Sequence, residues 1–238
     1  MQPTITLPRY QIVLLPGMDG GGTLFRRFIA AAPPNTSITL IPLPAEPLTY
    51  GQLADRAIAA LPDGDLVIVA ESFSGPLALA LAERKQVAAL VFCNSFVVAP
   101  RPRGLRWLVP SIVWKLPTPR FLLRHYMLGR VVDESLVEEV ATAIAAVPAD
   151  VLAFRLGLVL QVDDMEAFAR CDTPTLYLRS TGDRLVPDTA HLSMAARRPI
   201  KTAHVPGPHL LLQANPTGAW RSIVEFLGSL EPNRQAQR

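Results

Sequence analysis

The sequence predicts an α/β fold, with a mostly parallel sheet of about six strands, flanking helices and a helical cap. Short apolar runs alternate with helical patterns, and each run ends in Gly, Pro, Asp or Ser, as strands of such domains do. The 238 residues fit one domain of this kind and leave no room for a second. The alternation breaks between residues 96 and 162, and this interruption predicts the cap.

Six short apolar runs are predicted to form the strands of the sheet. Their nearly continuous hydrophobicity is typical of parallel strands that are buried on both faces. In chain order they are residues 11–15, 37–41, 66–70, 87–93, 175–179 and 202–205. Helices are predicted between or after these runs, where apolar residues recur at helical spacing. They cover residues 51–61, 76–85, 188–196 and 216–230.

The interruption at residues 96–162 contains three helical patterns and no clear strand. An insertion between two parallel strands is expected to lie over their carboxyl ends, where ligands bind. The predicted core is therefore residues 1–95 and 163–238, and the cap is residues 96–162. Aromatic residues of the cap are candidates for the substrate pocket, although a stripe that packs the cap onto the core would have the same spacing. They are Trp107, Trp114, Phe121 and Tyr126.

Composition and charge exclude several classes of protein. Half of the residues are hydrophobic and 18% are charged, which excludes intrinsic disorder and predicts a large buried core. The longest apolar stretch, residues 87–100, is shorter than the roughly 20 residues of a membrane span. The N-terminus lacks the pattern of a signal peptide, so we expect a cytoplasmic protein. Cys93 and Cys171 are expected to be free packing residues, without a disulfide or a metal site.

Basic residues gather in residues 101–130, which hold seven Arg or Lys and no Asp or Glu. No nucleic-acid-binding motif accompanies them, so a nucleic-acid partner is not expected. Solvated basic helices are one interpretation of this segment. The other is recruitment of an anionic carrier or head group, such as acyl carrier protein, coenzyme A or a phospholipid.

The most informative segment is residues 66–76, where a strand, a tight turn around Ser72 and a helix follow one another. A nucleophile on such a strained turn needs small residues two positions away, and here they are Ala70 and Ser74. Ser72 would begin the helix, and the amide of Phe73 is placed to donate to a developing oxyanion. The pattern departs from Gly-x-Ser-x-Gly at both glycines, and an ordinary Ser-Gly turn is the alternative.

This pattern resembles the α/β-hydrolase superfamily, and within it the small capped carboxylesterases, thioesterases and C–C hydrolases, over nearly the whole chain. Residues 14–20 (LLPGMDG) are similar to the family's loop after the first strand, which implies that the amide of Met18 is the second oxyanion donor. The glycines at 20–22 would permit close approach of a ligand. Only ten residues precede the first strand, so the resemblance also implies a sheet reduced at its N-terminal edge, apart from any contribution of residues 4–7.

The resemblance further implies an acid and a histidine after the serine, in that order. His209 follows the last predicted strand in a Pro-Gly-Pro-His loop and is the expected base. Asp183 follows the preceding strand in Gly-Asp-Arg-Leu-Val-Pro, which is similar to the family's acid loop. Asp163 and Asp164 are reserve candidates for the acid, and a solvated Asp in a turn is the alternative for Asp183. Glu71, beside the nucleophile, is expected to be an exposed turn residue.

The expected activity is hydrolysis of carboxylic esters with short-to-medium acyl chains, through an acyl-enzyme on the serine. An apolar cap with few polar groups suits such small ester substrates better than sugars or peptides. The alternatives are a thioesterase for acyl-carrier or coenzyme A thioesters, another reaction of the same fold such as C–C hydrolysis or acyl transfer, and a non-catalytic ligand receptor. No cofactor is expected.

Overall fold

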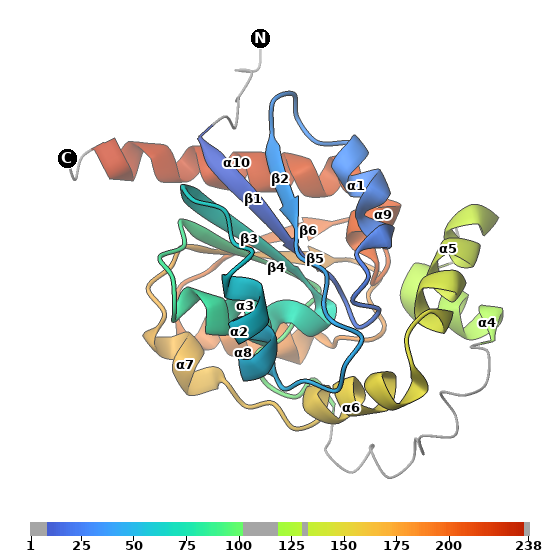
Figure 1. The fold of residues 1–238 in the computed structure, drawn as a ribbon. Helices are drawn as coiled ribbons and strands as arrows, with labels where there is room; N and C mark the ends of the chain where they lie inside the picture. Colours follow the sequence, from blue (N-terminus) through green and yellow to red (C-terminus); the bar gives the residue numbers. More distant parts are fainter. Residues whose placement is uncertain (1–8, 102–118, 130–132, 236–238) are drawn as a thin grey trace.

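The computed structural model describes residues 9–101, 119–129 and 133–235. The described chain forms a six-stranded parallel sheet with helices on both faces (Figure 1). The predicted α/β class and the number of strands are therefore confirmed. Trp107, Trp114 and residues 4–7 lie outside the described residues.

The strand order of the sheet is β2-β1-β3-β4-β5-β6. The strands are β1 (Tyr10–Leu15), β2 (Ser37–Leu40), β3 (Asp65–Glu71), β4 (Ala89–Cys93), β5 (Thr175–Ser180) and β6 (Lys201–Val205). Each coincides with a predicted strand, and the ends differ by one or two residues. The largest difference is at β4, which begins at Ala89 rather than at residue 87, although Ala88 already donates its amide to Leu66 O at 2.7 Å.

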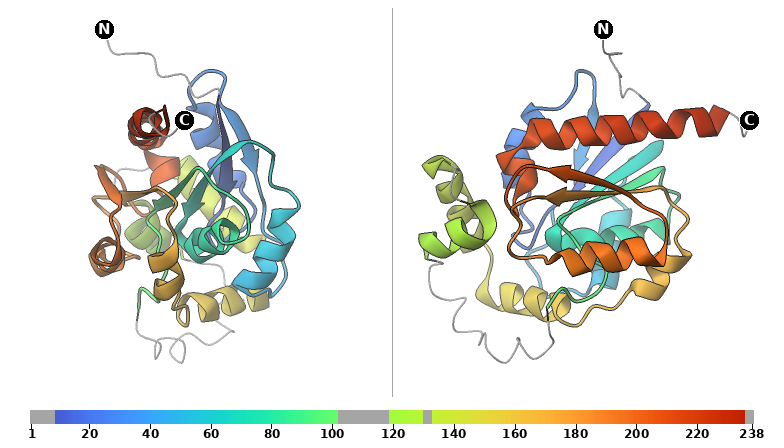
Figure 2. Two further views of the ribbon diagram at one scale, coloured as in Figure 1. Left: turned by 90° about the vertical axis from the view of Figure 1, so that its left-hand side faces the viewer. Right: turned by 180° about the vertical axis from the view of Figure 1, so that it is seen from behind.

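Alternate residues of the strands face two separate hydrophobic cores, one on each side of the sheet. One face, which includes Val13 and Ile68, is covered by α2 (Tyr50–Ile58), α3 (Gly75–Ala82), α7 (Met165–Arg170) and α8 (Asp188–Arg197). The other face, which includes Ile12 and Val67, is covered by α1 (Arg26–Ala30), α9 (Leu211–Ala214) and α10 (Pro216–Gln235). Figure 2 shows the long α10 on the opposite side of the sheet from α8.

Side-chain caps mark the starts of α2 and α10. Thr49 and Gln52 form a capping box at the start of α2, in which each side chain bonds the other residue's backbone amide. At the start of α10 the Asn215 side chain accepts the amide of Gly218 at 3.0 Å. The four predicted helices correspond to α2, α3, α8 and α10. The short helices α1 and α7 were not predicted, because five or six residues are too few for a helical repeat to stand out.

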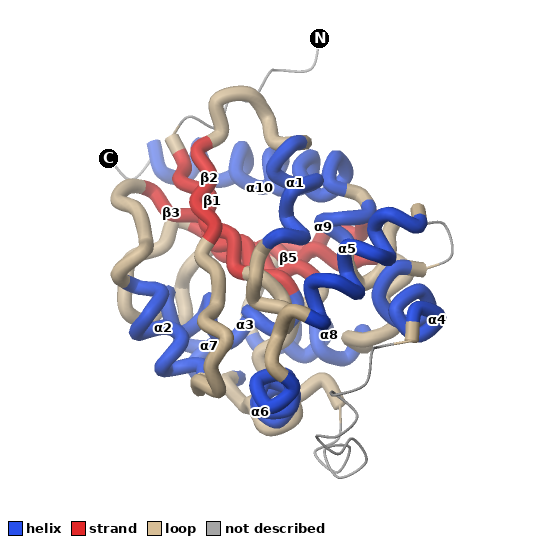
Figure 3. Tube along the Cα trace, turned by 45° about the vertical axis from the view of Figure 1, so that its right-hand side comes forward, coloured by secondary structure: helices blue, strands red, loops and turns tan. Residues whose placement is uncertain are grey.

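Between β4 and α7 the described chain forms α4 (Arg120–Leu122), the π-helical turn η5 (Leu123–Leu128), α5 (Glu134–Ala145) and α6 (Ala149–Val159). We call residues 96–162 the inserted segment. Its two ends lie side by side, since Ala99 donates to Val162 O at 2.9 Å and Asp164 donates to Val97 O at 2.8 Å. Figure 3 shows α4 and α5 together, with α6 apart from them.

Within the described ranges, no single helix has the length and the apolar composition to cross a membrane; the pair α5 and α6 passes that test only when joined, across a 97° bend.

Candidate active site

The register of the sheet brings five loops to one edge. Leu15 pairs with Ala70, Glu71 with Cys93, and Ser180 with Val205, so these strands end at nearly the same level. The loops that follow β1, β3, β4, β5 and β6 therefore meet at the carboxyl edge of the sheet. In open parallel sheets this edge is where ligands bind.

Three residues from these loops form one hydrogen-bonded chain. His209 Nε2 lies 2.9 Å from Ser72 Oγ, and His209 Nδ1 lies 3.0 Å from Asp183 Oδ1. The histidine is 2% exposed. With the proton on Nδ1, the imidazole donates to Asp183 and accepts the Ser72 hydroxyl, which uses both ring nitrogens. The structure thus brings together the three residues that the sequence predicts as nucleophile, base and acid.

The turn that carries Ser72 has the strained geometry expected of a nucleophile on a sharp bend. Ser72 has a φ of 48°, in the left-handed region that non-glycine residues avoid, and opens the short turn η2 (Ser72–Ser74) between β3 and α3. Ser95 Oγ donates to Ser72 O at 2.5 Å and so restrains the backbone of the turn. A side chain at Gly75 would clash with Ser95 Oγ and with Phe96 O, so this glycine permits the close approach of α3 to the end of β4.

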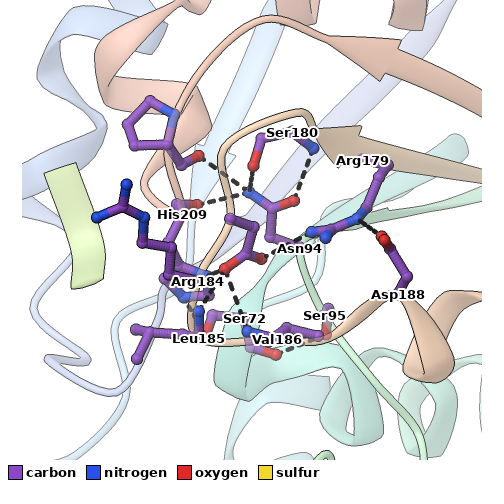
Figure 4. A network of polar contacts seen from close by, with 12 residues as sticks. Ser72, Asn94, Ser95, Arg179, Ser180, Arg184, Leu185, Val186, Asp188 and His209 are labelled. Carbon is purple, nitrogen blue, oxygen red and sulfur yellow. Dashed lines mark hydrogen bonds and ion pairs between the residues drawn. The ribbon is translucent and has the colours of Figure 1, made fainter. Parts of the chain in front are cut away.

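Asp183 is held by several donors at once. Its Oδ1 accepts the amides of Leu185 at 2.8 Å and Val186 at 3.1 Å, as well as the imidazole, and Arg179 Nη1 lies 3.2 Å from Oδ2. Figure 4 shows this network around His209 and Arg179. Burial raises the pKa of Asp183, but the hydrogen bond and charge of His209 and the two amides lower that pKa further, so it lies below its usual value.

Asn94 fixes the position of the His209 loop, and the sequence interpretation missed it. Its Nδ2 donates to His209 O at 2.7 Å and to Ser180 Oγ at 2.9 Å, while its Oδ1 accepts the amide of Ser180 at 2.9 Å (Figure 4). Its φ of 46° is one that Asn tolerates better than most residues. An Asn placed directly after a buried strand was the available signal for this role.

The loop after β1 contacts the turn of Ser72 directly. Ser74 Oγ donates to Pro16 O, so the small residue after the nucleophile also joins the two loops that hold Met18 and Phe73. The side chain of Phe73 is 1% exposed and packs against Tyr50, with ring centroids 5.0 Å apart. The oxyanion role of the Met18 and Phe73 amides stays a prediction.

The prediction that Glu71 is an exposed turn residue is wrong. Glu71 is 1% exposed, and Gln213 Nε2 donates to its Oε2 at 3.0 Å. The reason is that β3 runs one residue further than the apolar run, and Glu71 pairs with Cys93 inside the sheet. Burial raises the pKa of Glu71 to about 8, with the nearby Asp19 adding to the rise and Gln213 opposing it.

The described cap aromatics lie on the surface. Phe121 is 68% exposed and Tyr126 is 43% exposed, and their assignment to the substrate pocket stays a prediction, as it does for Trp107 and Trp114. The inserted segment does contact the His209 loop, because Leu210 donates its amide to Met127 O at 3.0 Å.

Basic residues of the inserted segment that the structure describes bond within the chain. Arg120 pairs with Glu138, and Arg124 pairs with Glu134. Arg101 donates to the carbonyls of residues 184 and 185, beside the acid loop. The anionic carrier or head group therefore stays a prediction.

The reserve acids and the two cysteines take no part in the hydrogen-bonded chain of Ser72, His209 and Asp183. Asp163 is exposed and Asp164 half-buried, and the Nδ1 partner of His209 is Asp183 rather than either reserve acid. Cys93 is buried and Cys171 half-buried, and both are free thiols. Among the residues whose positions are described, no three His, Cys, Asp or Glu side chains are grouped to hold a metal ion.

Comparisons with known proteins agree with this architecture. The family model described as "Alpha/beta hydrolase family" matches residues 12–220. A thermophilic esterase from Thermogutta terrifontis has a similar structure, with a TM-score of 0.77 and 19% identity over 92% of this chain and 89% of that one. An enol-lactonase from Burkholderia xenovorans is similar with a TM-score of 0.76 and 13% identity, over 94% of this chain and 92% of that one. A bromoperoxidase from Bacillus anthracis is similar with a TM-score of 0.77 and 13% identity, over 92% of each chain. Comparison with curated proteins found no match. At these identities the structural likeness shows the fold alone.

Proposed function

The chain belongs to the alpha/beta hydrolase family, and from this premise we propose that it is a serine hydrolase that cleaves carboxylic esters. The hydrogen-bonded chain from Asp183 through His209 to Ser72 carries this proposal. Each residue comes from a different loop at the carboxyl edge of the sheet, and the strained φ of Ser72 is maintained by the surrounding structure. Such strain is typical of functional positions.

The proposed mechanism follows from the donors and acceptors of this chain. His209 Nε2 takes the hydroxyl proton as Ser72 Oγ attacks the ester carbonyl, and ionised Asp183 stabilises the resulting imidazolium. The amides of Met18 and Phe73 hold the tetrahedral oxyanion. His209 then gives its proton to the leaving alcohol, and a water molecule activated by the same imidazole releases the acid from the acyl-enzyme.

The substrate class we propose is an ester with a short-to-medium acyl chain. Apolar residues of the inserted segment cluster with Leu210, the neighbour of His209, so a hydrophobic cluster lies beside the loop of the base. These residues include Leu123, Leu128, Leu136, Val137 and Val140. An apolar environment favours an uncharged acyl group over a sugar or a peptide.

A panel of p-nitrophenyl esters of increasing acyl length, with a thioester of the same acyl group, tests this proposal. We expect the wild type to turn over the shorter esters and Ser72→Ala to lose roughly 10⁴- to 10⁶-fold in kcat, leaving residual catalysis. Ser193→Ala is the matched control, since Ser193 is an exposed serine on α8 that donates to Ala190 O, and it should keep full activity.

Unchanged turnover by Ser72→Ala would contradict the proposal. A thioester rate well above the rate of the matched ester would replace the carboxylesterase assignment with a thioesterase that uses the same three residues. The panel is needed because proteins of this fold include both an enol-lactonase and a bromoperoxidase.

A further inference from the structure

Arg155 is a buried cation in the inserted segment that reaches the loop after β1. It lies on α6, is 1% exposed, and donates from Nη1 to Met18 O and from Nη2 to Pro44 O, each at 2.7 Å. Its Nε has no partner among the described residues. Removing a guanidinium from water is costly. Apolar side chains alone would be enough to pack a helix onto the core. The two carbonyl contacts therefore need an explanation.

The contact with Met18 completes a set of three. The carbonyls of Pro16, Gly17 and Met18 accept, in that order, the Ser74 hydroxyl, the Gly20 amide at 3.0 Å and the Arg155 guanidinium. Three successive carbonyls of one loop are thus held by three different donors. Arg155 is the only one of these donors that comes from the inserted segment.

These bonds fix the direction of the Met18 amide. A peptide unit is planar and trans, so its N–H points opposite to its C=O. Gly17 O points into the turn that Gly20 N closes, and the Met18 N–H of the same peptide therefore points out of that turn. The peptide on the other side of Met18 is held by Arg155. With both planes held, neither backbone dihedral of Met18 can rotate freely.

Gly20 shows how closely the guanidinium and the loop are fitted. It has a φ of 70°, and a Cβ at this position would lie 2.6 Å from Arg155 Nη1 and 3.1 Å from Cζ. A side chain at Gly22 would likewise clash with Leu40. The space beside Gly20 and Gly22, which the sequence predicts for close approach of a ligand, is thus occupied by the side chains of Arg155 and Leu40.

We propose that Arg155 is a positioning residue that couples the inserted segment to the oxyanion hole, by holding the Met18 carbonyl so that the Met18 amide keeps its direction. This inference rests on the proposed serine hydrolase function, in which that amide stabilises the oxyanion. Arg155 acts through Met18 and does not touch the reacting atoms. Displacement of the inserted segment would release the loop and weaken one oxyanion donor.

Arg155→Met and Arg155→Lys test the proposal against a purely structural role. Methionine removes both hydrogen bonds, and we expect kcat for the best ester to fall about 10- to 100-fold, as for a misdirected oxyanion donor, with KM nearly unchanged. The affinity for a trifluoromethyl ketone, whose serine adduct carries an oxyanion, should fall by a similar factor. Lysine keeps the charge and can reach one carbonyl, so it should restore part of kcat.

Arg198→Met is the matched control. Arg198 is half-buried and donates to Thr173 O at 3.0 Å. Its Cζ lies 4.4 Å from the ring centroid of Phe168, at the opposite end of β5 from the site. Its removal should lower the melting temperature and leave kcat and the ketone affinity unchanged. If Arg155→Met does not fold, Arg155→Lys tests the proposal instead, and its kcat is expected to be lower than that of the wild type.

The outcomes separate the two proposals. If the wild type is active and both Arg155 variants have the same kcat and the same ketone affinity as the wild type, the positioning role is overturned. A lowered melting temperature with both constants unchanged overturns it too, since Arg155 would then be structural. A wild type that neither cleaves esters nor binds the ketone overturns the proposed function, and the role of Arg155 with it. Ketone binding without ester cleavage overturns only the ester assignment, and the ketone affinities then decide the role of Arg155.

Discussion

Asp183 and Glu71 are two buried carboxyl groups close to the same serine, and their protonation differs. Asp183 follows β5 and has a fully buried side chain, and Glu71 ends β3 and is 1% exposed. The pKa of Asp183 lies below its usual value, whereas that of Glu71 is raised to about 8. At neutral pH the first group is ionised and the second is mostly protonated.

The difference comes from the donors that each group meets. Burial disfavours the charged form of both carboxyls. Asp183 has the imidazole and two amides on Oδ1, with Arg179 beside Oδ2. Glu71 has one neutral donor, Gln213, on Oε2, and Asp19 lies nearby. Its Oε1 has no hydrogen-bond partner within the described part of the chain. Similar burial thus gives one carboxylate suited to stabilise an imidazolium and one neutral acid that adds no charge to the site.

Asp183→Asn removes the charged member of the pair and should have the larger effect. The amide cannot stabilise the protonated His209, and it favours the wrong tautomer of the imidazole, so kcat/KM should fall about 10³- to 10⁴-fold at neutral pH. Steady-state kinetics with the best p-nitrophenyl ester measures this loss. The fold should be retained, because Asn is nearly isosteric with Asp.

Asp164→Asn is the control for that variant. Asp164 is a half-buried carboxyl that lies just after the inserted segment and outside the hydrogen-bonded chain, so its amide variant should keep wild-type activity. An Asp164→Asn enzyme that loses as much activity as Asp183→Asn would show that the acid had been assigned to the wrong loop.

Glu71→Gln should change stability rather than catalysis. With a pKa near 4.5 in the unfolded chain and about 8 in the fold, Glu71 holds a proton that unfolding releases between these values. The free energy of unfolding of the wild type therefore falls as pH rises through this range. Glutamine cannot ionise, so the variant should match the wild type at about pH 5 and exceed its stability by on the order of 4 kcal/mol at about pH 9.

Denaturant unfolding of both proteins across this pH range measures the difference. Glu225→Gln, at an exposed position of α10, is the control for removal of a surface charge. A stability difference between Glu71→Gln and the wild type that does not grow with pH would mean that Glu71 is ionised in the folded protein at neutral pH.

Local patterns in the sequence predicted the features that depend on neighbouring residues. Continuous apolar runs identified the strands, and the small residues around Ser72 identified the nucleophile turn. The acid and the base were predicted from the resemblance to the α/β-hydrolase superfamily, which implies an acid and a histidine in the loops after the last two strands. Glu71 was assigned to the surface because the sharp turn at Ser72 was expected to point its side chain away from the site.

The features that were missed depend on contacts between distant residues. Arg155 and Met18 are separated by 137 residues, and Asn94 and His209 by 115. No periodicity or motif links such pairs, and an arginine on an amphipathic helix is normally expected at the surface. The hydrogen bond from Ser74 to Pro16 was not predicted for the same reason, since only the fold brings the two loops together.

The central claim is that Ser72 is a nucleophile activated by His209 and Asp183. Incubation with a fluorophosphonate, followed by intact-mass and peptide mass spectrometry, tests it most directly. We predict one phosphonyl group per chain, attached to Ser72, with no labelling of Ser72→Ala and slower labelling of Asp183→Asn. Labelling of another residue, or equal labelling of the wild type and Ser72→Ala, would contradict the account.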